Sequence, residues 1–148
     1  MTADAVGDRT EAVRDRYRAT LGSVPSGVED RLRIAGTFDR LRTEEALAAL
    51  RQLVLADSPL GARVQQLVHV GQLLSLGRAE PARLHARGAL HVGASLADLV
   101  GVAETALITT GVPAYALGIE IIAELLREQD ERDAQDAQGA GEAAGSAG

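Results

Sequence analysis

The chain has 148 residues, of which 46% are hydrophobic, and a formal net charge of −6 at pH 7. A chain of this length folds as one domain that buries roughly two-thirds of its unfolded surface. Residues 128–148 hold six acids against Arg132. They are also rich in Ala, Gly and Gln, which cannot bury enough apolar surface to offset their ordering entropy. We therefore expect a folded domain over residues 1–127, close to neutral in charge, and a disordered tail over 128–148.

This balance excludes several classes of protein. A near-neutral domain lacks the basic surface that nucleic-acid binding requires. The longest uncharged stretch, residues 105–119, is shorter than the ~18 apolar residues of a membrane span. Acids near the N-terminus do not fit a signal peptide, so we expect a cytoplasmic protein. Without cysteine or lysine, thiol and Schiff-base chemistry are excluded.

Helical periodicity recurs along the chain with glycine or proline between the segments. The predicted helices cover residues 10–21, 28–34, 43–55, 60–76, 81–92, 96–110 and 113–127. Thr10 and Thr43 are the expected N-caps of two of them. Ser95 and Asp98 form a capping-box pattern before a third. No segment alternates as a strand does. The prediction is an all-α protein, a compact bundle of about six to seven helices.

Three histidines are candidates for proton transfer near neutral pH. His85 lies on the apolar face of the predicted helix 81–92, and His69 lies on the most apolar helix of the chain. His91 is six residues beyond His85, about 240° around the helix, and is expected to point away from it. For each buried histidine, a hydrogen-bonded core residue without a catalytic role is the alternative.

Glu104 interrupts an otherwise uncharged apolar segment, where a carboxylate must be paired, hydrogen-bonded or protonated unless it faces solvent or another subunit. Thr105 and Thr109 add hydroxyls to the same helix. His69, His85 and Glu104 together are chemically a two-histidine, one-carboxylate set, so a metal-dependent enzyme is one alternative.

The segment from Leu73 to Leu90, which contains Gly77-Arg78-Ala79-Glu80 and Leu84-His85, resembles the carboxymuconolactone decarboxylase family and its alkylhydroperoxidase D-type relatives. Gly93-Ala94-Ser95 and Gly111-Val112-Pro113-Ala114 follow at matching positions, and the similarity covers roughly residues 60–125. The resemblance implies a helical bundle that assembles into homo-trimers or homo-hexamers. It also implies a lyase-like enzyme with a pocket lined by the histidine helix.

The chain departs from that family at four places. Peroxidase relatives carry a Cys-x-x-Cys pair where this chain has Arg78 and Pro81, so thiol peroxidase activity is not expected. Gln65-Gln66 replaces a frequent Arg-Glu pair, which removes a possible proton-relay acid. Thr109-Thr110 replaces a frequent Tyr before Gly-Val-Pro, and Glu104 stands where relatives are usually apolar.

The resulting hypothesis is cofactor-free acid–base catalysis on a small cyclic oxygenated metabolite, by decarboxylation, isomerisation or ring rearrangement. His85 is the predicted proton shuttle, oriented by Glu80 or Glu104. Arg78 is predicted to hold a carboxylate or enolate oxygen. His69, Thr105 and Thr109 are predicted to bind substrate. The non-catalytic alternative is a binding or assembly protein that retains the fold.

Overall fold

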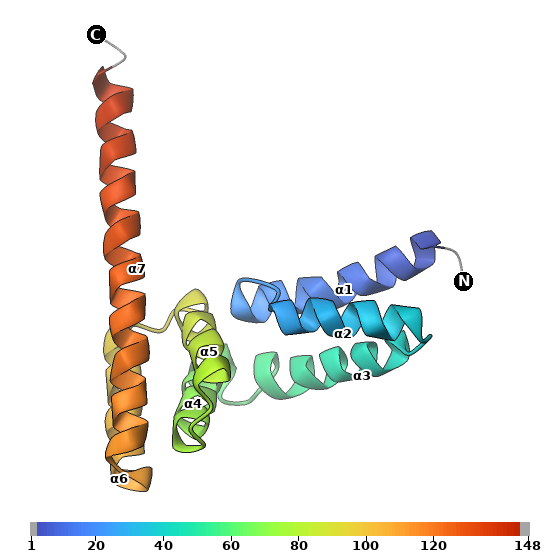
Figure 1. Cartoon of the computed structure of the whole chain (residues 1–148), viewed down its shortest axis with the longest axis horizontal. Helices are drawn as coiled ribbons and strands as arrows, with labels where there is room; N and C mark the ends of the chain where they lie inside the picture. Colours follow the sequence, from blue (N-terminus) through green and yellow to red (C-terminus); the bar gives the residue numbers. More distant parts are fainter. Residues whose placement is uncertain (1–2, 146–148) are drawn as a thin grey trace.

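The computed structural model describes residues 3–145, with side chains described for residues 6–140. The predicted all-α class is confirmed, since this part of the chain forms helices and no strand. The helices, drawn in Figure 1, are α1 (Ala3–Leu21), α2 (Ser26–Thr37), α3 (Leu41–Arg51), the π-helical η1 (Gln52–Ala56), α4 (Gly61–Ser75), α5 (Ala79–His91), α6 (Leu96–Thr110) and α7 (Val112–Gly145). None of them is long and apolar enough to cross a membrane.

The helices pack around two apolar clusters. Helices α1, α2 and α3 enclose the first, which is built from Val13, Tyr17, Leu21, Val28, Leu32, Ala35, Leu41 and Ala48. Helices α4 to α7 enclose the second, which is rich in alanine, including Ala82, Ala86, Ala89, Ala103 and Ala106. In Figure 1, α1 to α3 run across the direction of α6 and α7, and α4 and α5 lie between these two sets of helices. The short alanine side chains let neighbouring helices approach closely.

Local sequence explains some helix ends but not others. Ser95 caps α6 as predicted: its Oγ accepts a hydrogen bond from the backbone of Asp98, whose carboxylate accepts one from the Ser95 backbone. The predicted Thr10 and Thr43 caps are wrong, because α1 begins at Ala3 and α3 at Leu41. Thr10 lies inside α1 and donates to the Gly7 carbonyl, a bond that competes with the helical ladder without ending it.

The last helix is longer than the sequence suggests. The expected helix end near Arg127 is wrong, since α7 continues to Gly145. The disorder expected over residues 128–148 stays a prediction. Residues 129–140 are all exposed. Their Ala, Gln, Glu and Arg side chains favour helix, and their lack of apolar groups prevents burial without preventing helix formation. The domain boundary at residue 127 stays a prediction.

We predict that Gly118→Ala destabilises the chain by about 1–3 kcal/mol, the typical cost of overpacking a core. A Cβ at this position of α7 would lie 2.7 Å from the Cβ of Ala103 on α6, and neither atom can rotate away. Chemical unfolding in urea measures the difference from wild type.

Gly36→Ala is the matched control, because a Cβ there meets nothing within 4 Å. Alanine is also the better helix former, so this variant is expected to be at least as stable as wild type. Equal stability of the two alanine variants would contradict the close packing of α6 on α7.

Candidate functional site

The histidine pair lies where α4 and α5 pack together. Gln66 and His69 are one turn apart on α4, and His85 faces them from α5. The rings of His69 and His85 have centroids 3.9 Å apart and planes tilted by 44°. His85 is 5% exposed and Gln66 is 1% exposed, so the polar groups of this site are enclosed by helices. His69 and His85 therefore lie in ring contact, a convergence that the sequence left open.

A hydrogen bond determines the tautomer of His85. Its Nδ1 lies 2.8 Å from Oε1 of Gln66. The amide is oriented this way because its Nε2 donates to the carbonyl of Thr20 in α1, at 3.5 Å. An amide oxygen only accepts, so Nδ1 of His85 carries a proton in either charge state. In the neutral form of the ring, Nε2 is therefore the proton-accepting nitrogen.

The surroundings favour this neutral form. Burial is the main cause that lowers the pKa of His85 to about 3, and the positive charges that His69 and Arg51 can carry act in the same direction. Burial also lowers the pKa of His69, again assisted by Arg51. Nδ1 of His69 is buried and has no hydrogen-bond partner among the described residues. Both imidazoles are thus uncharged near neutral pH, and one of them retains an unused buried nitrogen.

Helix α1 closes the site at one end. A Cβ on Gly88 of α5 would lie 2.8 Å from Cδ2 of Leu21 and 3.4 Å from Oε1 of Gln66. Glycine at this position therefore lets α1 approach α5 directly beside the Gln66–His85 hydrogen bond. His91 lies outside, exposed near the chain reversal at Gly22, as expected from its place on the helix.

The polar residues predicted at the start of α5 lie on the surface. The Glu80 side chain is 87% exposed and pairs with Arg83 at 3.1 Å. Arg78, the residue before α5, is exposed as well. No hydrogen bond or ion pair found in residues 6–140 joins either side chain to the histidines, so the predicted orientation of His85 by Glu80 is replaced by Gln66.

Glu104 is also exposed, which matches the solvent-facing alternative for this residue. It does not join His69 and His85: within the described residues, no three His, Asp or Glu side chains are grouped so that they could hold a metal ion. Thr105 and Thr109 donate to the carbonyls of Gly101 and Thr105 in their own helix. The two-histidine, one-carboxylate set of the metal-dependent alternative is therefore not assembled in the described part of the chain.

Thr105 and Thr109 line a different hollow, an open groove between α4 and α6 with a volume of about 760 Å³. Its walls are mostly apolar and include Val64 and Val68 from α4. The groove is large enough for a small molecule or for side chains of another protein.

Two residues of the site were not predicted from sequence. In the sequence, Gln66 indicates only the loss of a possible proton-relay acid. Its polar side chain, one turn from His69 on an apolar helix, could also have indicated a residue of the site. Arg51, at the end of α3, acts on both histidines through its charge. Nothing in the sequence connects residue 51 with residues 69 and 85, because their proximity depends on how α3 packs against α1 and how η1 packs against α4.

Comparison with known proteins agrees with this architecture. The model of the carboxymuconolactone decarboxylase family matches residues 42–124. A crystal structure of a provisionally assigned carboxymuconolactone decarboxylase from Burkholderia xenovorans LB400 superposes with a TM-score of 0.69 at 18% identity. The match covers 86% of this chain and 98% of that chain, which establishes a shared fold. No curated protein sequence matches the chain.

We predict that His85 makes the folded chain sensitive to acid. Its pKa is about 3 in the folded state and ~6.5 when unfolded. Between these values the unfolded chain binds one more proton than the folded chain, so stability is complete above pH ~6.5 and falls as the pH falls. The contribution is about 1.4 kcal/mol per pH unit, measured by urea unfolding at pH 6.0 and 4.5.

His85→Gln is expected to flatten this dependence relative to wild type. His91→Gln, which changes an exposed histidine of the same helix, is expected to leave it unchanged. The assignment fails if all three proteins lose stability equally over this range.

Proposed function

This chain belongs to the carboxymuconolactone decarboxylase family, and we propose that it is a cofactor-free, lyase-like enzyme that moves a proton on a small cyclic oxygenated metabolite. The reaction is a decarboxylation, an isomerisation or a ring rearrangement, with His85 as the acid–base group. The observation that carries this proposal is the enclosed His85 imidazole, whose Nδ1 is held by Gln66 and whose Nε2 keeps its lone pair. The ring of His69 beside it, whose buried Nδ1 has no partner among the described residues, supports this role.

The chemistry follows from that tautomer. In an isomerisation, Nε2 of His85 takes a proton from a carbon next to a carbonyl group and the carbon's bonding electrons pass to the carbonyl oxygen. His85 then returns the proton to another carbon of the same substrate, so no further reactant is needed. In a decarboxylation, carbon dioxide leaves, its bonding electrons stay on the ring, and His85 delivers a proton drawn from solvent.

A bound anionic substrate would assist the protonated state. An opposite charge near an imidazole raises its pKa, which counteracts the burial that lowers the pKa of His85 in the free protein. His69 is proposed to bind the substrate through Nδ1, the buried nitrogen that has no partner. We leave Glu80, Glu104 and Arg78 out of the reacting centre, because their side chains are exposed and no contact within residues 6–140 links them to it.

We predict that His85→Gln lowers turnover by about 10²- to 10⁴-fold, the usual contribution of a positioned acid–base group. The assay incubates wild type and variant with a panel of carboxylated five-membered lactones in D₂O and follows them by proton NMR. Loss of a carboxyl group and exchange of a ring proton for deuterium are both visible in such spectra.

His91→Gln is the control, since it removes an exposed imidazole from the same helix. Full activity of His85→Gln on a lactone that wild type converts would refute the assignment of His85. If wild type binds panel members without any proton exchange, the non-catalytic binding protein is the correct reading of the fold.

We also propose that the groove between α4 and α6 is covered by a second copy of this chain in a homo-oligomer, such as a trimer or hexamer. The groove is mostly apolar, and its one acid, Asp98, is already paired with Arg63 at 2.7 Å. Leu76 in its lining is 71% exposed, and Ile108, three residues beyond Thr105 of the lining on α6, is 87% exposed. Large exposed apolar side chains around a charge-neutral hollow are typical of a contact between protein chains, and an identical partner presents the same surface.

Ile108→Asp is expected to shift the protein to a smaller species in light scattering after size exclusion. The new carboxylate would be buried without a partner at the contact, whereas the isolated fold tolerates it because this side chain is exposed.

Phe38→Asp is the matched control, because Phe38 is 69% exposed after α2, away from the groove. An unchanged mass for Ile108→Asp, or a monomeric wild type, would contradict the proposed contact.

A further inference from the structure

Tyr17 of α1 lies between two arginines, of which only one is paired with a carboxylate among the described residues. Arg31 lies 5.9 Å from the ring centroid, donates to the Tyr17 hydroxyl at 2.8 Å and pairs with the carboxylate of Glu44 at 3.0 Å. Arg51 lies 5.1 Å from the same centroid and pairs with no carboxylate in the described part of the chain. The face of an aromatic ring stabilises a cation by electrostatic attraction. It does not accept hydrogen bonds from the five N–H donors of a guanidinium, which lie in the plane of the guanidinium itself.

This state of Arg51 is unusual within the protein. Four of the 15 arginines are partly buried, namely Arg9, Arg14, Arg51 and Arg83. Three of them make ion pairs with glutamates at 2.5 Å, 2.9 Å and 2.9 Å. The other described arginines without an ion pair are exposed. Arg51 is thus the partly enclosed cation whose donors the chain itself leaves unused.

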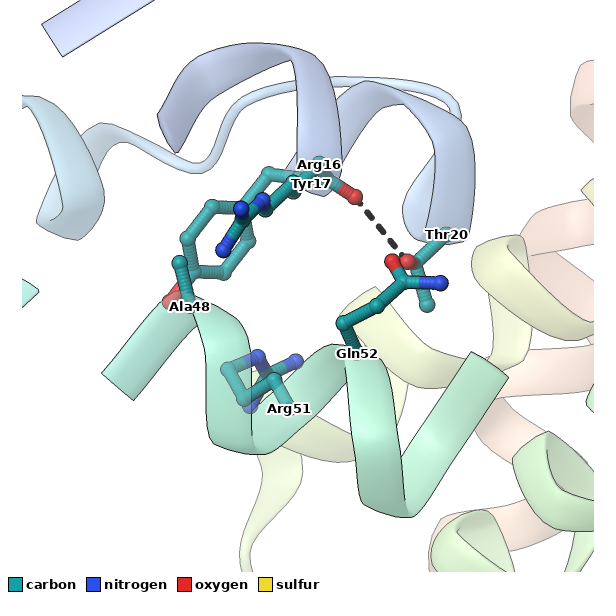
Figure 2. Close-up of a pocket in the computed structure, with 6 residues that line it drawn as sticks. All are labelled: Arg16, Tyr17, Thr20, Ala48, Arg51 and Gln52. Atoms are coloured by element: carbon teal, nitrogen blue, oxygen red, sulfur yellow. Dashed lines mark hydrogen bonds between the residues drawn. The ribbon is translucent and has the colours of Figure 1, made fainter. Parts of the chain in front are cut away.

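The unused donors line a small cavity. Arg16, Tyr17 and Thr20 of α1 face Ala48 and Arg51 of α3 and Gln52 of η1 around it (Figure 2). Its volume is about 10 Å³, roughly the space of one water molecule or one oxygen atom. Arg16 supplies a second guanidinium, which makes no ion pair among the described residues and acts on Glu45 only through its charge. The π-helical turn that follows Arg51 is a local widening of the kind often found at functional sites.

Hydrogen bonds link the wall of the cavity to the histidine pair. Thr20 lines it, and the Thr20 carbonyl accepts the hydrogen bond from Gln66, whose oxygen accepts from His85. Arg51 is near enough to lower the pKa of both His69 and His85 through its charge. The described residues place a cation, two neutral imidazoles and a buried unpartnered nitrogen together, with no carboxylate among them.

We propose that Arg51, assisted by Arg16, is the anion-binding element of this site and holds one oxygen of a carboxylate on a small ring-containing ligand. The inference rests on the proposed function in taking the histidine pair as the reacting centre. Only an oxygen enters the cavity, and the ring of the ligand lies outside it. Tyr17 holds the Arg51 guanidinium from its face and leaves the N–H edge for the ligand.

The test measures binding, separately from turnover, by isothermal titration calorimetry. The probe is 2-furoate, a small cyclic carboxylate, and 2-furamide is the uncharged analogue of the same shape. Wild type is expected to bind furoate at least about tenfold more tightly than furamide, because a guanidinium–carboxylate contact is a charge-assisted hydrogen bond. Arg51→Gln is expected to remove this preference, and Arg16→Gln to reduce it. Arg51→Lys, which keeps the charge, is expected to retain part of it.

Arg42→Gln is the control, since it removes an exposed arginine from the same helix and is expected to bind furoate as wild type does. Wild type that binds furoate no better than furamide, or Arg51→Gln with unchanged furoate affinity, overturns the proposal. If circular dichroism shows that Arg51→Gln is unfolded, the proposal is tested by the furoate–furamide comparison on wild type and on the Arg51→Lys variant. His85→Gln is expected to keep furoate binding, so a failure of the catalytic assignment leaves this binding result distinct.

Discussion

The hydrogen bond between Gln66 and His85 links the packing of the molecule to its chemistry. Gln66 accepts from His85 on α5 and donates to Thr20 at the end of α1, so one side-chain amide joins α4 to both groups of helices. Leaving either buried partner unsatisfied costs about 1–3 kcal/mol. The same amide fixes which nitrogen of His85 carries the proton. Packing and tautomer are therefore set by one residue.

Ion pairs elsewhere explain why the centre of the site has no acid of its own. Arg83 of α5 is surrounded by Glu80, Glu120 and Glu124, which attach the outer face of α5 to the surface of α7. Arg87 is paired with Glu128 on the same side. These contacts occupy the carboxylates on the outer face of α5, while His85 on its inner face meets an amide and another imidazole. Among the described residues, Arg51 is the arginine whose charge acts on both histidines.

Much of the fold could be predicted because it depends on local pattern. Helical periodicity with Gly and Pro between segments predicted the helices, and the Ser95–Asp98 capping box could be recognised from four consecutive residues. The inward face of His85 was predictable because Ala89 shares it. The start of α3 was not, because Leu41 is buried against other helices and packing outweighed the cap expected at Thr43.

The site itself was less predictable because convergence is a tertiary property. His69 and His85 could be named as candidates from their apolar surroundings, but Glu104 has equally apolar neighbours in sequence and is exposed. The sequence alone gives no measure of which face of α6 is left open. Arg51 had no sequence signal at all, since its importance comes from an absent partner, and absence of an ion pair is visible only when every neighbouring helix is in place.

Glutamine at position 66 has a further consequence for how the site is charged. A glutamate there would place a negative charge 2.8 Å from Nδ1 of His85 and would favour the imidazolium form. The neutral amide gives the same orientation without that charge, so burial and Arg51 keep His85 uncharged in the free protein. The negative charge that would favour protonation of His85 must then come from the bound ligand. An anion beside Arg51 offsets the charge that opposes protonation, and so the affinity of His85 for a proton is coupled to occupancy of the site.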